Sequence, residues 1–149
     1  MGVLLVLVPL AAAVCLVAGD GYVDISGVGR YNLVERNVTW RKARSLCNDE
    51  AAHLLVLDSA KEYEAIIQHF GRNITSSGQE VHIGFHSLFV HDEWLTIFDD
   101  PLGESGYSKW IIDNPEEGER CGGLCTEPDG LCSQHCDKSL FFICEQESK

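Results

Sequence analysis

The segment from Cys121 to Cys144 reads CGGLCTEPDGLCSQHCDKSLFFIC and holds five of the chain's seven cysteines. Its first four cysteines follow the spacing C-x3-C-x6-C-x3-C, a symmetrical pattern that indicates nested bridges. The apolar run Phe141-Phe142-Ile143 before the last cysteine predicts a buried strand. The same spacing suits a four-thiolate zinc site, but an oxidising compartment favours disulfides.

The N-terminus indicates that compartment. Residues 3–18, VLLVLVPLAAAVCLVA, are uncharged and apolar, and they are fewer than the roughly 20 residues of a membrane span. The small residues Val17-Ala18-Gly19 suit a secretory cleavage site. We therefore predict a signal peptide over residues 1–19 and a secreted single domain over residues 20–149. The lack of a positive residue after Met1 argues for the alternative, an uncleaved anchor.

Cleavage near Gly19 removes Cys15 and leaves six cysteines. An even number in a small secreted domain indicates a disulfide framework, although six cysteines allow fifteen pairings. The sequons Asn37-Val-Thr39 and Asn73-Ile-Thr75 predict N-glycosylation at Asn37 and Asn73.

The charge balance excludes some partners. The chain has 23 Asp and Glu residues against 11 Lys and Arg, a formal net charge of −12. Such a surface repels nucleic acid and anionic membranes, so we expect neither nucleic-acid binding nor membrane insertion after the leader is removed. The sequence contains no nucleophile elbow, phosphate loop or histidine-zinc motif, and we predict that the protein is not an enzyme.

Two amphipathic helices are predicted in the first half. Thr39 is placed to cap a helix that runs to about Glu50. The capping box from Ser59 to Glu62 begins the second helix, and Gly71 is expected to end it.

The other segments favour short strands and one long loop. Strands are predicted at 22–25, 31–34, 53–57, 81–85, 93–98 and 140–145. Residues 72–79 form a predicted polar loop that carries the second sequon, and residues 99–137 show no periodicity, which predicts a long loop held by cross-links. Two helices before a strand-rich half indicate an α+β class.

Several short motifs between about Gly29 and Glu145 together resemble the C-type lectin-like domain. These motifs are Trp40-Arg-Lys-Ala-Arg-Ser-Leu-Cys47, Ala52-His-Leu-Leu-Val56, His82-Ile-Gly-Phe85, Trp110, Cys121, Cys136 and Phe142-Ile-Cys-Glu145. Ile83-Gly-Phe-His86 and the segments 94–98 and 106–110 most resemble secreted arthropod lectins of the immulectin and hemolymph lipopolysaccharide-binding type. The resemblance implies a C-type lectin-like fold.

The resemblance also implies a disulfide pairing. The family's long-range bridge would join Cys47 to Cys144, and its loop bridge would join Cys121 to Cys136. The remaining pair is Cys125 and Cys132.

Calcium-dependent members of the family bind sugar through a Glu-Pro-Asn or Gln-Pro-Asp triplet, a further Glu, and an Asn-Asp pair on the next strand. At the triplet position this chain has Asn114-Pro115-Glu116, and Glu119 stands two residues before Cys121. The resemblance thus implies Asn114, Glu116 and Glu119 as calcium ligands. Ser133 and Gln134 stand where the Asn-Asp pair is expected, which argues against a complete Ca²⁺ site. The triplet Glu127-Pro128-Asp129 follows the loop cysteine, and we interpret it as a chance match in a turn.

The predicted function is that of a secreted glycan-binding, pattern-recognition module of innate immunity with a degenerate calcium-sugar site. Its ligand surface would lie between Asp113 and Gln134, with Asn114, Glu116, Glu119, Ser133 and Gln134 as the candidate contacts. The alternative is a calcium-independent lectin-like protein that binds a protein partner through the same loop.

Overall fold

The computed structural model describes residues 20–147. The predicted signal peptide lies outside the described residues. Among those residues, neither α-helix combines the length and apolar composition needed to cross a bilayer.

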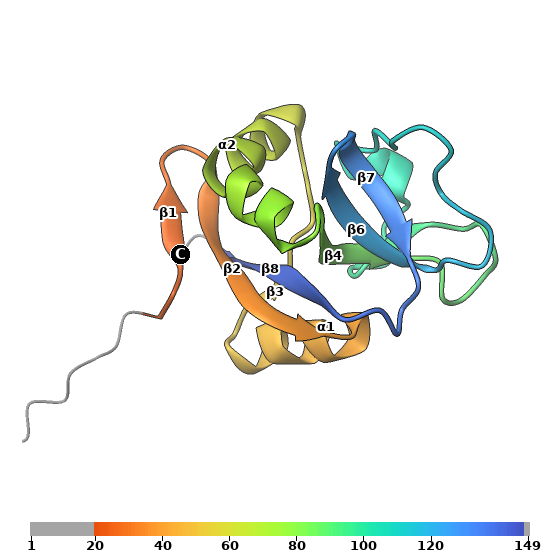
Figure 1. Ribbon diagram of the computed structural model, residues 1–149, viewed down its shortest axis with the longest axis horizontal. Coiled ribbons are helices and arrows are strands. Elements are labelled where there is room, and N and C mark those ends of the chain that lie inside the picture. The colour runs from red at the N-terminus through yellow and green to blue at the C-terminus, as the bar shows by residue number, and fades with distance from the viewer. Residues whose placement is uncertain (1–19, 148–149) are drawn as a thin grey trace, which may run out of the picture.

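The described chain has two α-helices and eight strands (Figure 1). The helices are α1, Trp40–Asp49, and α2, Ala60–Ser77, with a short 3-10 helix η1 at Leu102–Glu104. The strands are β1, Val23–Ile25; β2, Gly29–Val38; β3, His53–Leu54; β4, Glu80–His86; β5, Leu95–Thr96; β6, Cys121–Thr126; β7, Asp129–Gln134; and β8, Leu140–Gln146.

The strands form one mixed sheet in the order β1-β2-β8-β4-β6-β7, with β3 paired to β8 and β5 to β4. Its pairings are antiparallel except for that of β4 with β8. The predicted class, α+β with two helices and a C-type lectin-like fold, is confirmed.

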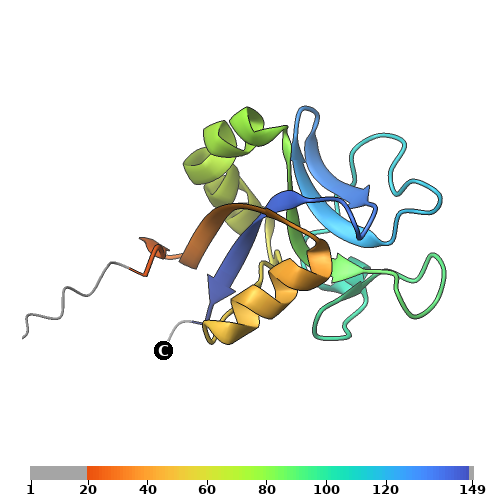
Figure 2. The ribbon, with the colours of Figure 1, turned by 60° about the horizontal axis from the view of Figure 1, so that its bottom comes forward.

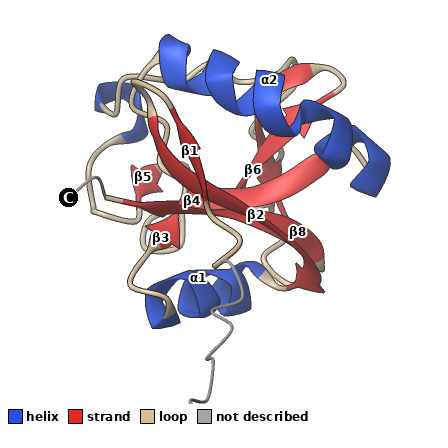
Figure 3. Ribbon diagram, turned by 90° about the vertical axis from the view of Figure 1, so that its left-hand side faces the viewer, coloured by secondary structure: helices blue, strands red, loops and turns tan. Residues whose placement is uncertain are grey.

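The helices lie on opposite sides of the sheet (Figure 3). On one side, α2 contributes Tyr63, Ile66, Phe70 and Ile74 to the larger hydrophobic cluster. On the other, α1 contributes Trp40, Ala43 and Cys47 to a second cluster. The Thr39 side chain caps α1 as predicted, because its Oγ1 accepts a hydrogen bond from the Lys42 backbone N–H at 3.3 Å.

The prediction that α2 ends at Gly71 was wrong. The helix continues to Ser77, and Gly78, at φ +125°, is its C-cap. A glycine inside a helix costs about 1 kcal/mol relative to alanine, whereas burying an isoleucine side chain contributes about 1.5–3 kcal/mol. Ile74, one helical turn beyond Phe70, is fully buried, so continuing the helix is favoured. The second sequon asparagine therefore lies in α2 and not in a loop.

The prediction of a long irregular segment over residues 99–137 was wrong in part, because only the stretch between η1 and β6 is a long loop. Strands β6 and β7 pair antiparallel through a tight turn at Glu127-Pro128, with Thr126 opposite Asp129. Their glycine-rich and cysteine-rich sequences have weak strand propensity, but close packing requires Gly122, where an added Cβ would lie 2.5 Å from the Phe85 ring. Two strands are shorter than predicted. The strand predicted at residues 53–57 is β3, of two residues, and the strand predicted at 93–98 is β5, also of two residues.

Three disulfides cross-link the fold: Cys47–Cys144, Cys121–Cys136 and Cys125–Cys132. They are the pairs that the resemblance implies, and they occupy the thiols that a zinc site would need. The first joins α1 to β8, and the third joins β6 to β7. The long loop between η1 and β6 projects from the end of the molecule opposite β1 (Figures 1 and 2).

Candidate functional site

The expected ligand loop, residues 113–119, is anchored beside β7. Just before the loop, the Ile111 N–H donates to the Leu131 carbonyl at 2.9 Å, and the Leu131 N–H donates to the Lys109 carbonyl at 2.9 Å. Within the loop, the Glu119 N–H donates to the Glu116 carbonyl at 3.2 Å. These backbone bonds bring the loop back toward the end of β7.

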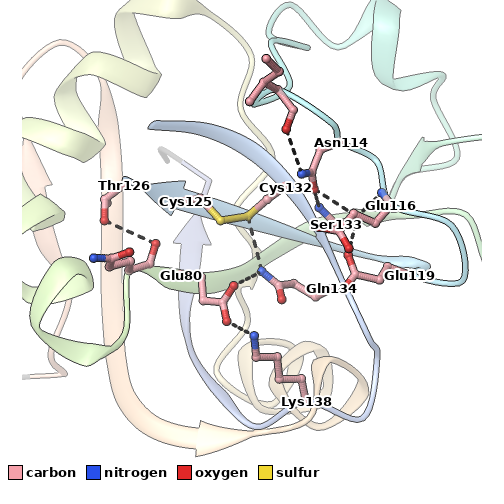
Figure 4. Close-up of a disulfide and its surroundings, with 12 residues drawn as sticks. Glu80, Asn114, Glu116, Glu119, Cys125, Thr126, Cys132, Ser133, Gln134 and Lys138 are labelled. Carbon is pink, nitrogen blue, oxygen red and sulfur yellow. Dashed lines mark hydrogen bonds and ion pairs between the residues drawn. A yellow bond between two sulfur atoms is a disulfide. The ribbon is translucent and has the colours of Figure 1, made fainter. Parts of the chain in front are cut away.

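Ser133, in β7, connects the loop residues (Figure 4). Its backbone N–H donates to Asn114 Oδ1 at 2.9 Å. Its hydroxyl lies 2.7 Å from Glu119 Oε2 and 3.2 Å from Asn114 Oδ1, and accepts a hydrogen bond from the Glu116 backbone N–H at 2.8 Å. The structure thus brings together four of the five predicted contacts, Asn114, Glu116, Glu119 and Ser133.

Gln134 points away from this group, because successive side chains in a strand alternate between faces. Its Nε2 donates to Glu80 Oε2 at 2.7 Å and approaches the Cys132 sulfur at 3.4 Å. Lys138 forms an ion pair with the other oxygen of Glu80. Gln134 is therefore a buried structural residue on the far side of the hairpin (Figure 4).

A Ca²⁺ ion takes six to eight oxygen ligands, and the predicted ligands Asn114, Glu116 and Glu119 are the residues of the loop that would supply them. Asn114 Oδ1 and Glu119 Oε2 already accept hydrogen bonds from Ser133, and Glu116 joins the group through its backbone. Among residues 20–147, the one group of three His, Cys, Asp or Glu ligand atoms close together is Glu80, Cys125 and Cys132. Its two sulfurs are joined in a disulfide.

A profile of the lectin C-type domain matches residues 36–146. The chain belongs to the C-type lectin domain family. The family consists of binding domains and not of enzymes, which agrees with the lack of catalytic motifs.

Two proteins are similar in sequence to this C-type lectin domain over most of its length. It is 32% identical over 136 residues to hemolymph lipopolysaccharide-binding protein of Periplaneta americana, covering 85% of this chain and 52% of that protein. The chain thus spans about half the length of this relative. It is 23% identical over 123 residues to snaclec bitiscetin subunit alpha of Bitis arietans, covering 77% of this chain and 85% of that subunit.

Solved structures share the fold of this C-type lectin domain. The carbohydrate-recognition domain of the mouse scavenger receptor C-type lectin aligns with a TM-score of 0.73 at 23% identity, covering 89% of this chain and 99% of that one. Human lithostathine aligns with a TM-score of 0.75 at 18% identity, covering 88% and 100%. A calcium-independent type II antifreeze protein aligns with a TM-score of 0.72 at 20% identity, covering 89% and 96%.

The C-type lectin domain also contains a buried carboxyl group, Glu62, and a half-buried one, Glu145, that the sequence did not single out as a pair. Glu62 accepts hydrogen bonds from the Tyr31 hydroxyl at 2.5 Å and from the Asp58 N–H at 2.7 Å. Glu145 accepts one from the Val56 N–H at 3.2 Å. Burial raises the pKa of Glu62 to about 7, and burial together with the nearby Glu62 raises the pKa of Glu145 to about 8. Both residues occur in recognised motifs, but only the fold shows that they share one environment.

One large apolar side chain of the lectin domain is exposed beside the ligand loop. Ile112, two residues before Asn114, is 80% exposed. The loop therefore offers an apolar contact next to its acidic side chains Asp113, Glu116 and Glu117, which are exposed.

Proposed function

We propose that the protein is a secreted pattern-recognition lectin of innate immunity that binds glycans of microbial surfaces through residues 113–134. The observation that carries the proposal is the 32% identity, over 85% of the chain, to a protein named for lipopolysaccharide binding in hemolymph. The exposed loop and its anchoring by β7 supply a rigid surface that suits this function. The carboxylates and amide of the loop are the groups that accept hydrogen bonds from sugar hydroxyls.

The charge of the protein selects which part of a lipopolysaccharide is bound. A chain of net charge −12 is repelled by a phosphorylated lipid. The polysaccharide portion is therefore the ligand. Asn114, Glu116 and Glu119 contribute to its binding from the loop, with Ser133 supporting them, and Gln134 takes no direct part. Calcium contributes little in this proposal, because Ser133 and Gln134 stand where the family has its Asn-Asp pair.

Binding to immobilised lipopolysaccharide, to its delipidated polysaccharide and to the isolated lipid portion tests this proposal. We expect comparable affinity for the first two and none for the third. Glu116→Gln should weaken polysaccharide binding several-fold, whereas Glu104→Gln, an exposed change in η1, should leave it unchanged. Absence of polysaccharide binding would overturn the proposal.

A second candidate function is recognition of a protein partner through the same loop, without calcium. Ile112 favours it, because apolar side chains at the centre of a protein interface contribute strongly to affinity. A snaclec subunit is among the relatives. Such binding would resist chelator, as the proposed glycan binding would, but it would also resist free monosaccharides and weaken at least tenfold on Ile112→Asp, which glycan binding would not.

Secretion and glycosylation belong to the same proposal. Asn37 in β2 and Asn73 in α2 are both exposed, so attached glycans would extend into solvent. Expression in a eukaryotic host should yield a chain that begins near residue 20 and loses mass on enzymatic deglycosylation. Mutation of both asparagines to glutamine should abolish that loss.

A further inference from the structure

We propose that Ser133 takes the place of a cation in this domain, holding the loop from Asp113 to Glu119 in its shape, so that the loop stays organised without calcium. The proposal depends on the proposed function only in taking this loop as the ligand surface. It assigns Ser133 as a positioning residue.

The hydrogen-bond geometry carries the first step. Glu119 Oε2 lies 2.7 Å from the Ser133 hydroxyl and Asn114 Oδ1 lies 3.2 Å from it. The single hydroxyl proton is therefore directed to the carboxylate, where a charge-assisted bond is the stronger one. Asn114 Oδ1 is satisfied instead by the Ser133 backbone N–H at 2.9 Å. The hydroxyl oxygen then accepts the Glu116 N–H, so one residue binds three points of the loop.

The position of Ser133 in the fold restricts its movement. Ser133 is 4% exposed, and it pairs with Gly122 between strands β6 and β7. The preceding residue, Cys132, is bridged to Cys125. A group fixed by pairing, burial and a neighbouring cross-link holds the geometry of its partners.

A cation entering the loop would have to displace these bonds. To recruit Asn114 Oδ1 and Glu119 Oε2 it must compete with the donors of Ser133. The hydrogen-bonded form is therefore the stable form of the loop whether or not calcium is present. Ligand binding at the loop should accordingly be insensitive to chelator.

Hydrogen exchange read by mass spectrometry on the mature protein tests the inference, because it reports local opening segment by segment. Peptides covering residues 113–119 should show equal protection in calcium and in chelator. A loss of protection on chelation would overturn the proposal. No sugar takes part in this measurement, so failure of glycan binding and failure of this inference are distinguishable.

Variants at Ser133 test the inference in the same hydrogen-exchange experiment. Ser133→Ala should speed exchange of these peptides roughly thirty-fold, about 2 kcal/mol, with and without calcium. Ser133→Thr, which keeps the hydroxyl, should restore most of the protection. Ser105→Ala is the matched control, since Ser105 bonds backbone carbonyls near η1, and it should leave residues 113–119 unchanged. Unaltered exchange of the loop in Ser133→Ala would overturn the role assigned to Ser133.

Discussion

At the scale of single residues, Gly84 shows how closely β3 and β4 approach each other. Its N–H donates to the Leu55 carbonyl at 2.7 Å, and an added Cβ would lie 2.6 Å from the Leu54 carbonyl oxygen. Both neighbours are backbone atoms of a buried segment, so a side chain at this position requires the strands to separate. The glycine of the motif His82-Ile-Gly-Phe85 is thus explained by contact with the chain before α2.

Gly84→Ala should therefore destabilise the protein by about 1–3 kcal/mol, the usual cost of overpacking. Urea denaturation of the oxidised protein measures this change. Gly103→Ala is a suitable control, because nothing lies within 4 Å of its added Cβ. Equal midpoints for the two variants would contradict the close approach.

At the scale of elements, the length of α2 is determined by the side chain that it buries after Gly71, that of Ile74. An added Cβ at Gly71 would make only an ordinary contact, 3.6 Å from Ile67 Cγ2, whereas Gly78 has φ +125°. Gly71→Ala should stabilise the protein by about 0.5–1 kcal/mol, and Gly78→Ala should destabilise it by a similar amount. Thermal melting of both variants checks the pair. Destabilisation by Gly71→Ala would indicate that the helix ends there.

Local sequence patterns were sufficient to predict an element where the residues that determine it lie within that element. Both helix starts were predicted from Thr39 and Ser59, because a cap acts within one turn. The hairpin of β6 and β7 could not be predicted, because Gly122 is required by Phe85, which comes from β4. For the same reason the sequence predicted Ser133 and Gln134 as neighbours in one site, although strand alternation separates them onto two faces.

The disulfide Cys125–Cys132 cross-links β6 and β7, two strands that are already hydrogen-bonded to each other along their length. It closes a loop with a sequence separation of 7 residues, against 97 for Cys47–Cys144. The chain-entropy model gives about 2 kcal/mol for the short loop and about 4.7 kcal/mol for the long one.

We therefore expect the double variant Cys125→Ala, Cys132→Ala to remain folded with about 2 kcal/mol less stability. The matched variant Cys47→Ala, Cys144→Ala should lose more than twice that amount. Urea denaturation under oxidising conditions compares them, and equal losses would count against the loop-length account. Intact mass should show no free thiol in the wild-type mature chain.

At the scale of the whole molecule, the carboxyls of Glu62 in α2 and Glu145 in β8 repel each other and couple stability to pH. The pKa values of both carboxyls, about 7 and about 8, lie above the usual value of 4.5, so the folded state retains protons that the unfolded state has released. Stability is then greatest near pH 5 and falls as the pH rises through 7 and 8. The net charge of −12 acts in the same direction, since carboxylate repulsion opposes the compact state.

We expect the free energy of unfolding to fall by several kcal/mol between pH 5 and pH 8, because the unfolded carboxyls have released their protons over this range while the folded ones still hold theirs, and this corresponds to about 10 °C or more in melting temperature. Glu145→Gln removes one titrating group and its repulsion with Glu62, so it should flatten most of this slope. Glu104→Gln, an exposed change in η1 whose charge does not act on either carboxyl, should leave the slope intact. Melting curves at half-unit pH steps compare the three proteins. A melting temperature that rises toward pH 8 in the wild type would show that the pair is ionised and compensated in the fold, and would reverse the sign of the coupling.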